Sequence, residues 1–186
     1  MTLDIIDKEL FNCNYELCKQ CGGRCCKRNA CDCSPEDFDN DVNKIRLAIQ
    51  SGNYTIDFTR FAADSFVITL DQVYLDTRRV MTNPYEAFFI RPKNIGRPIV
   101  DLIHKTEDEG PCIFWNKDTG CPLKYEKRPK GGRTLVPFLG NNCIAQYDKI
   151  QLIADWRPFT GFLIELAKEY FDENWVIYRE FNFSIK

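Results

Sequence analysis

The sequence predicts an α+β fold, with helices at both ends of the chain and a small antiparallel β region in the middle. Two patterns support this prediction: apolar residues recur at helical spacing before residue 52 and again after residue 144, and short β-branched and aromatic segments lie between Tyr54 and Ile103. The chain has 186 residues, of which 44% are hydrophobic. That length suits one domain of roughly 100–200 residues, so we expect a single domain over residues 1–186.

The helices are expected in three places. The first covers residues 4–20. Ser34 and Pro35 predict the start of the second, because Ser is a favoured N-cap and Pro a favoured first helical residue, and Gly52 ends it. Its apolar face has spacings of four, three and four residues: Phe38, Val42, Ile45 and Ile49. Helical patterning returns at Ile144, where Pro158 starts or kinks a helix whose face comprises Phe159, Phe162, Leu163, Leu166 and Tyr170.

The strands are expected between these helices. Four segments favour short strands: Ser65–Leu70, Gln72–Asp76, Ala87–Arg91 and Pro98–Ile103. The aromatic-rich stretch Trp175–Phe183 is expected to be a packed strand or coil.

Charge and motifs exclude several function classes. The chain has 25 Lys and Arg against 27 Asp and Glu, a net charge of −2, and a generic polyanion binder would need a basic excess or a basic face. We therefore expect no nucleic-acid partner, and no phosphate-binding glycine motif is present. The basic run Lys124–Arg133 reads as a solvated turn, with the alternative that Arg128 and Arg133 offset thiolate charge near Cys121.

The sequence also favours a compartment. The first residues include Asp4, Asp7 and Glu9 and lack the basic and apolar regions of a secretory signal. No apolar run approaches the ~18 residues of a membrane span. We expect a cytoplasmic protein with no membrane partner, where clustered cysteines more often bind metal or carry out redox chemistry than form disulfides.

The ten cysteines fall into two groups. Seven lie between Cys13 and Cys33, the next 78 positions have none, and the last three are Cys112, Cys121 and Cys143. A disulfide scaffold would spread its cysteines more evenly. This distribution predicts one cysteine-rich metal site that joins two distant parts of the chain.

The first group contains a metal-binding pattern. Cys18 and Cys21 form a Cys-x2-Cys knuckle, which lets two thiolates of one tight turn face the same ion. Gly22 and Gly23 follow directly and permit the positive φ of such a turn, and Cys25 and Cys26 come next.

The second group is expected around a hairpin. Asn116–Gly120 is rich in turn residues, and a hairpin there would put Cys112 and Cys121 nearly opposite each other at its open end. Cys143 is expected to open a helix, whose dipole would favour the thiolate. His104, the single histidine, is expected at the end of a strand rather than as a ligand.

An almost purely sulfur site favours zinc or iron, including an iron–sulfur cluster. Two function classes follow. One is a metal-binding protein whose metal is structural or serves metal handling, with an unknown protein partner. The other is a small iron-dependent redox or protein-modifying enzyme.

The paired motifs resemble a known family. Cys18-x2-Cys21-Gly-Gly-x-Cys25-Cys26, followed by the segment from Cys112 through Arg128-Pro129 to Cys143, is similar to the bacterial cysteine-cluster family of zinc- or iron-chelating proteins (YkgJ-like). The resemblance implies metal chelation without a settled reaction. It also implies the ligand set, which comprises Cys18, Cys21, Cys25, Cys26, Cys112, Cys121 and Cys143.

One position departs from that family. Many members have a cysteine where this chain has Gly132, so Cys31 or Cys33 is a candidate replacement. Alternate side chains of an extended segment lie about 7 Å apart, so we expect only one of this pair to join a given ion. Cys13 lies outside the family pattern.

Overall fold

The α+β class is confirmed by the computed structural model, which describes residues 22–60, 66–67, 86–101, 103–104, 110–138 and 142–170. The helices are α2 (Arg24–Arg28), α3 (Val42–Gln50), α6 (Lys130–Arg133), α7 (Lys149–Trp156) and α8 (Thr160–Glu169), with 3-10 turns η2 (Pro35–Phe38), η3 (Tyr125–Lys127) and η4 (Arg157–Phe159). The strands are β1 (Tyr54–Arg60), β2 (Phe66–Val67), β3 (Glu86–Pro92), β4 (Ile103–His104), β5 (Leu135–Phe138) and β6 (Asn142–Ala145). The expected segments 4–20, Gln72–Asp76 and Trp175–Phe183 lie outside the described residues.

In the described part of the chain, the β structure consists of three antiparallel strand pairs. β1 pairs with β3 from Tyr54↔Pro92 to Arg60↔Glu86, β2 pairs with β4, and β5 pairs with β6. The expected strand Ala87–Arg91 is confirmed within β3, and His104 lies in β4 opposite Phe66. Sequence reasoning did not single out β1, which is the partner of β3.

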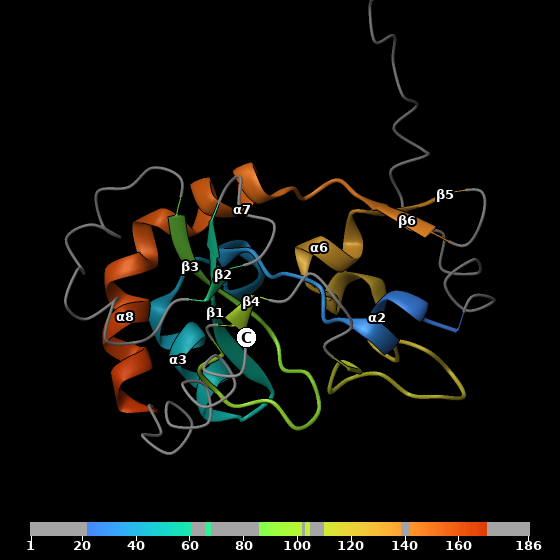
Figure 1. Cartoon of the computed structure of the whole chain (residues 1–186), viewed down its shortest axis with the longest axis horizontal. Helices are drawn as coiled ribbons and strands as arrows, with labels where there is room; N and C mark the ends of the chain where they lie inside the picture. Colours follow the sequence, from blue (N-terminus) through green and yellow to red (C-terminus); the bar gives the residue numbers. More distant parts are fainter. Residues whose placement is uncertain are drawn as a thin grey trace, which may run out of the picture.

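The β1–β3 pair is the centre of a core lobe, which we define as this pair with α3, α7 and α8 (Figure 1). α3 contacts β1, and α7 and α8 contact β3. The largest side chains of this core are almost fully buried, among them Trp156, Phe58 and Phe88. A buried ion pair joins the two strands, where Arg91 Nε donates to Asp57 Oδ2 at 2.7 Å.

The expected helix after Ser34 is divided in two. Asp39 and Asn40 have φ of 54° and 55°, which ends the 3-10 turn η2. Asp41 then caps α3 by accepting a hydrogen bond from the Asn43 backbone N–H. Ile45 and Ile49 are buried as the spacing predicts, but Val42 is 40% exposed because a new helix with its own orientation begins there.

The C-terminal helical region begins later than expected. Residues 142–145 form β6, and the first helix starts at Lys149 because the Asp148 side chain accepts from the Gln151 backbone N–H. Pro158, which was expected to start or kink a helix, lies in the 3-10 turn η4 between α7 and α8. Leu163 and Leu166 of the predicted face are buried in the core. Within the described ranges, no helix has both the length and the apolar character to cross a membrane.

Candidate metal-binding pocket

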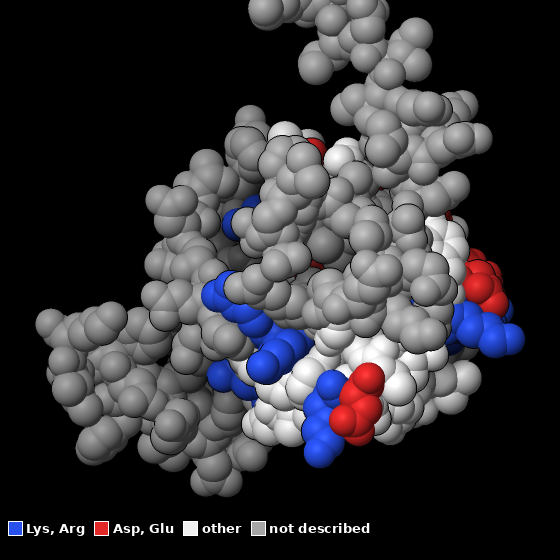
Figure 2. All heavy atoms as spheres, turned by 90° about the vertical axis from the view of Figure 1, so that its right-hand side faces the viewer, with Lys and Arg blue, Asp and Glu red and all other residues white. Residues whose placement is uncertain are grey.

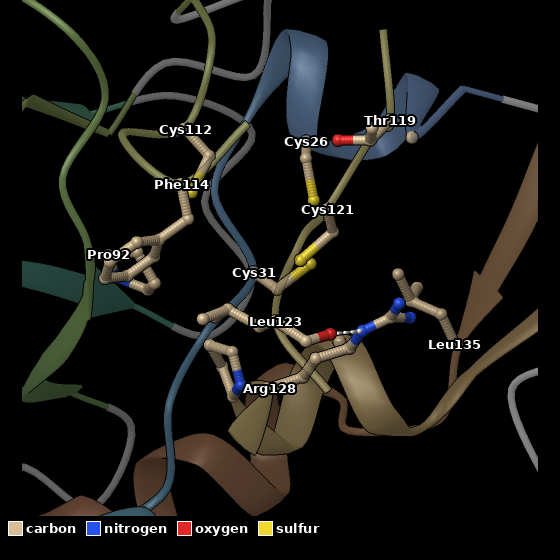
Figure 3. Close-up of a pocket in the computed structure, with 13 residues that line it drawn as sticks. Cys26, Cys31, Pro92, Cys112, Phe114, Thr119, Cys121, Leu123, Arg128 and Leu135 are labelled. Carbon is tan, nitrogen blue, oxygen red and sulfur yellow. Dashed lines mark hydrogen bonds between the residues drawn. The ribbon is translucent and has the colours of Figure 1, made fainter. Parts of the chain in front are cut away.

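Cysteines from both groups line one pocket beside the core lobe (Figure 3). Cys26 and Cys31 come from the first group, and Cys112 and Cys121 come from the second. Cys26 and Cys112 are buried, and Cys31 and Cys121 are half-buried. The fold therefore brings together cysteines that are far apart in the sequence. The shortest separation between the two groups is 81 residues, from Cys31 to Cys112, and the longest is 95 residues, from Cys26 to Cys121.

Backbone contacts hold the two segments against each other. The Cys112 N–H donates to the Cys26 carbonyl at 2.8 Å, and Trp115 Nε1 donates to the Gly22 carbonyl at 3.2 Å. These bonds do not depend on the sulfur atoms. The pocket wall is thus built by main-chain pairing, which leaves the cysteine side chains to line the space between the segments.

Glycines allow this close approach. Gly23 has φ +67°, and a Cβ on it would lie 3.0 Å from the Gly120 Cα. Gly120 has φ +73°, and a Cβ there would lie 3.1 Å from the Gly23 nitrogen. The turn after the Cys-x2-Cys motif therefore packs directly on the turn that precedes Cys121, and neither residue can carry a side chain without a shift.

Cys31 and Cys33 face different parts of the protein. Cys31 lines the pocket, and Cys33 is 1% exposed within the main core. The carbonyl of Cys33 accepts from Trp156 Nε1 at 2.7 Å. Burial, followed by the nearby Asp37 and Asp32 carboxylates, raises the pKa of the Cys33 thiol well above its usual value. These positions agree with the expectation that the side chains of Cys31 and Cys33 lie apart and do not face the same place.

Two glycines of α6 support the Cys31 segment. The Gly131 N–H donates to the Asp32 carbonyl at 2.9 Å, and a Cβ on Gly131 would lie only 2.8 Å from that oxygen. A Cβ on Gly132 would instead lie 3.6 Å from Cys31 Sγ, in ordinary contact. Gly132 thus borders Cys31, one of the two cysteines that the family resemblance offered as a replacement at this position.

The expected hairpin is smaller than predicted. Its pairing is confined to the Asn116↔Gly120 bridge, and Cys112 pairs instead with Asn94. The reason is that residues 111–113 join the loop after β3, where the Ile113 N–H donates to the Lys93 carbonyl at 2.8 Å. Cys112 and Cys121 still line the same pocket, but Cys112 is positioned by the core lobe rather than by a hairpin partner.

The two arginines of the basic run have different roles. Arg128 is 6% exposed, lines the pocket and donates from Nε to the Leu123 carbonyl at 3.1 Å. Arg133 forms an ion pair with Asp37 at 2.7 Å. The sequence left open the alternative that both arginines offset thiolate charge. The position of Arg128 in the pocket is consistent with that alternative, whereas Arg133 forms its ion pair with Asp37 instead.

The structure describes the other predicted ligands only in part or not at all. Cys18 and Cys21 lie outside the described residues, as does Cys13. Cys25 belongs to α2, and only its backbone is described. Cys143 lies in β6 opposite Pro137, so its expected position at the start of a helix is wrong.

The pocket offers soft sulfur donors in a mostly apolar wall. Phe114, Leu123 and Leu135 are among its lining residues, and Arg128 is the charged one. The five cysteines whose side chains are described are thiols rather than disulfides. In the described part of the chain, no three Cys, His, Asp or Glu side chains already form a group that could hold a metal ion.

Comparisons of the chain with protein-family models, curated proteins and solved structures found no match. The function therefore has to be argued from the pocket itself.

Proposed function

We propose that the protein binds zinc or iron, either as an ion or as an iron–sulfur cluster, through cysteines of both groups. The observation that carries the proposal is the meeting of Cys26, Cys31, Cys112 and Cys121 around one pocket. Thiolates in this number are the ligands that zinc and iron–sulfur clusters prefer. The resemblance to the cysteine-cluster family of chelating proteins points to the same chemistry.

The described residues fit such a site in donor type. No group of three donors is already assembled among them, so binding requires the side chains around the pocket to rotate inward or requires donors from elsewhere. Cys18, Cys21, Cys25 and Cys143 are the proposed further ligands. Arg128, buried in the wall, would offset part of the negative charge that several thiolates bring.

Cys31 is the proposed replacement for the family cysteine that is absent at Gly132. Its sulfur is 3.6 Å from the position that a Cβ on Gly132 would occupy. Cys33 is a poor candidate because its side chain is buried in the core and does not line the pocket. In a reducing cytoplasm, which we propose as the location, these thiols would stay available for metal.

A bound metal would link the two segments of the pocket. Ligand thiols lose their protons when they bind, and metal binding that requires the folded site adds directly to folding free energy. A structural or metal-handling role needs nothing beyond these residues.

Anaerobic purification followed by elemental analysis and absorbance spectroscopy tests the proposal. Zinc in a colourless protein, or iron with absorbance near 400 nm, would support it. We expect Cys31→Ser and Cys121→Ser each to lower the metal content at least severalfold. Cys33→Ala is the matched control, because it removes a nearby thiol that lies outside the pocket.

A metal-free protein after anaerobic purification and reconstitution with either metal would refute the proposal. Equal metal loss in Cys33→Ala and Cys31→Ser, with both variants folded by circular dichroism, would refute the assignment of the pocket.

A further inference from the structure

The cysteine lobe, defined as residues 22–31 and 110–138, carries a charge opposite to that of the rest of the chain. It contains nine Lys and Arg but two Asp and Glu, a formal charge of +7 in a chain whose total is −2. All remaining residues together therefore carry −9. The near balance of the whole composition hides this separation.

Four lysines of this lobe form an exposed set, which we call the lysine face: Lys27, Lys117, Lys124 and Lys127. They belong to α2, to the turn before Cys121 and to the segment that contains η3. Each of these segments also contributes to the pocket wall, through Cys26, Thr119 and Leu123 respectively. Figure 2 shows the side of the molecule that lies on the right of Figure 1, where Lys and Arg side chains lie at several places on the described surface and Asp or Glu side chains adjoin some of them.

Ion pairing distinguishes the lysine face from the core lobe. On the core lobe, Lys44 is paired with Asp39, and Lys168 with Glu165. Within the described ranges, none of the four lysines of the lysine face forms an ion pair. The exposed acidic residues of the cysteine lobe are Asp118 and Glu126, which leaves the face with a positive surplus.

A surface with a surplus of positive charge favours association with an anionic one. Surface charges of one sign raise the rate of association with a partner of the opposite sign. Like charges that are crowded together repel one another. The surplus lies in the cysteine lobe, whereas the other described residues carry a formal charge of −3, which a long polyanion that extended beyond the lobe would meet. A short acidic segment fits within the lobe without that repulsion.

The aromatic residues of the lobe also argue against single-stranded nucleic acid. Such ligands stack their bases on exposed aromatic rings. Here Trp115 and Tyr125 are half-buried, and both have their polar atoms tied within the lobe, to the Gly22 and Arg133 carbonyls.

We propose that the lysine face docks an acidic segment of a partner protein at the rim of the cysteine pocket. This position would bring the partner next to the thiols. The docking does not require the metal, so it can be tested separately from the proposed function.

The test measures fluorescence anisotropy of a labelled twelve-residue peptide of alternating Glu and Ser, titrated with the full chain at low salt. We expect K117E/K124E to weaken binding about tenfold, since two attractive contacts become repulsive. K44E/K168E is the matched control, because it changes the net charge equally on the core lobe, and we expect it to change binding less than twofold.

Three outcomes would overturn the proposal: no peptide binding by the unaltered chain at low salt, an equal effect of both double variants, or tighter binding of a twelve-nucleotide single strand than of the peptide. Metal content is measured on the same samples. Normal peptide binding by a chain that takes up no metal would refute the proposed function alone, and absent peptide binding by a metal-loaded chain would refute the docking alone.

Discussion

Gly131 and Gly132 allow a sharp test of how the Cys31 segment is held. A Cβ added at Gly131 would lie 2.8 Å from the Asp32 oxygen and 3.0 Å from the Asp32 nitrogen. Both are backbone atoms, so no side chain can rotate away. To reach the ordinary contact distance of 3.4 Å, the Asp32 carbonyl would have to retreat by about 0.6 Å, which also strains the hydrogen bond from the Gly131 N–H.

The size of the effect follows from two opposing contributions. Overpacking of this kind typically costs about 1–3 kcal/mol. Replacement of a helical glycine by alanine contributes up to about 1 kcal/mol in the other direction. Gly132→Ala has the same helix contribution, but its Cβ would meet Cys31 Sγ at an ordinary 3.6 Å. We therefore expect Gly131→Ala to be about 1–3 kcal/mol less stable than Gly132→Ala.

Urea denaturation of the two variants, followed by circular dichroism, measures this difference directly. Both variants lie in the same short helix and add the same methyl group, so their comparison isolates the contact with Asp32. Equal midpoints, or a more stable Gly131→Ala protein, would show that the Cys31 segment does not rest on α6 as described.

Three further predictions concern the pocket. Removal of bound metal by a strong chelator should lower the melting temperature by several degrees, because the ion would stabilise only the folded site, and an unchanged melt after verified metal loss would contradict this. Gly132→Cys should restore metal content to a Cys31→Ser protein, since a thiol there would reach the same region of the pocket, and failure to do so in a folded double variant would count against Cys31 as a ligand. Gly23→Ala should destabilise the chain more than Gly22→Ala, by roughly 1–3 kcal/mol in thermal or urea unfolding. Both glycines have positive φ, but only a Cβ on Gly23 would meet the Gly120 backbone. Equal losses of stability would disprove the close packing of the two turns.

Local sequence patterns predicted those elements whose signals lie within a few residues. The spacing of Ile45 and Ile49 gave the buried face of α3, and the β-branched and aromatic residues of 87–91 gave the centre of β3. Pro158 marked the junction between α7 and α8. In each case the deciding interaction is a backbone preference or a side-chain period, which a short window contains.

The errors arise where local signals compete. Phe38 and Val42 continue the apolar spacing of one helix, but Asp39 and Asn40 adopt left-handed backbone conformations and Asp41 provides a new cap. Residues 142–145 resemble the start of a helix in sequence, yet pairing with β5 makes them a strand. Strand pairing depends on a partner segment, so a window around Cys143 cannot reveal it.

The sequence by itself determined the chemistry available to this protein: ten cysteines in two separated groups, glycines beside them and five basic residues in the later run Lys124–Arg133. Only the tertiary structure decided which cysteines share a pocket, that Cys31 faces it while Cys33 joins the core, and that the lysines gather on the same lobe. The physical reason is that thiol identity and charge are properties of single residues. Proximity, by contrast, depends on backbone contacts such as those between Cys112 and Cys26 and between Gly120 and Gly23, which join segments about 90 residues apart in the chain.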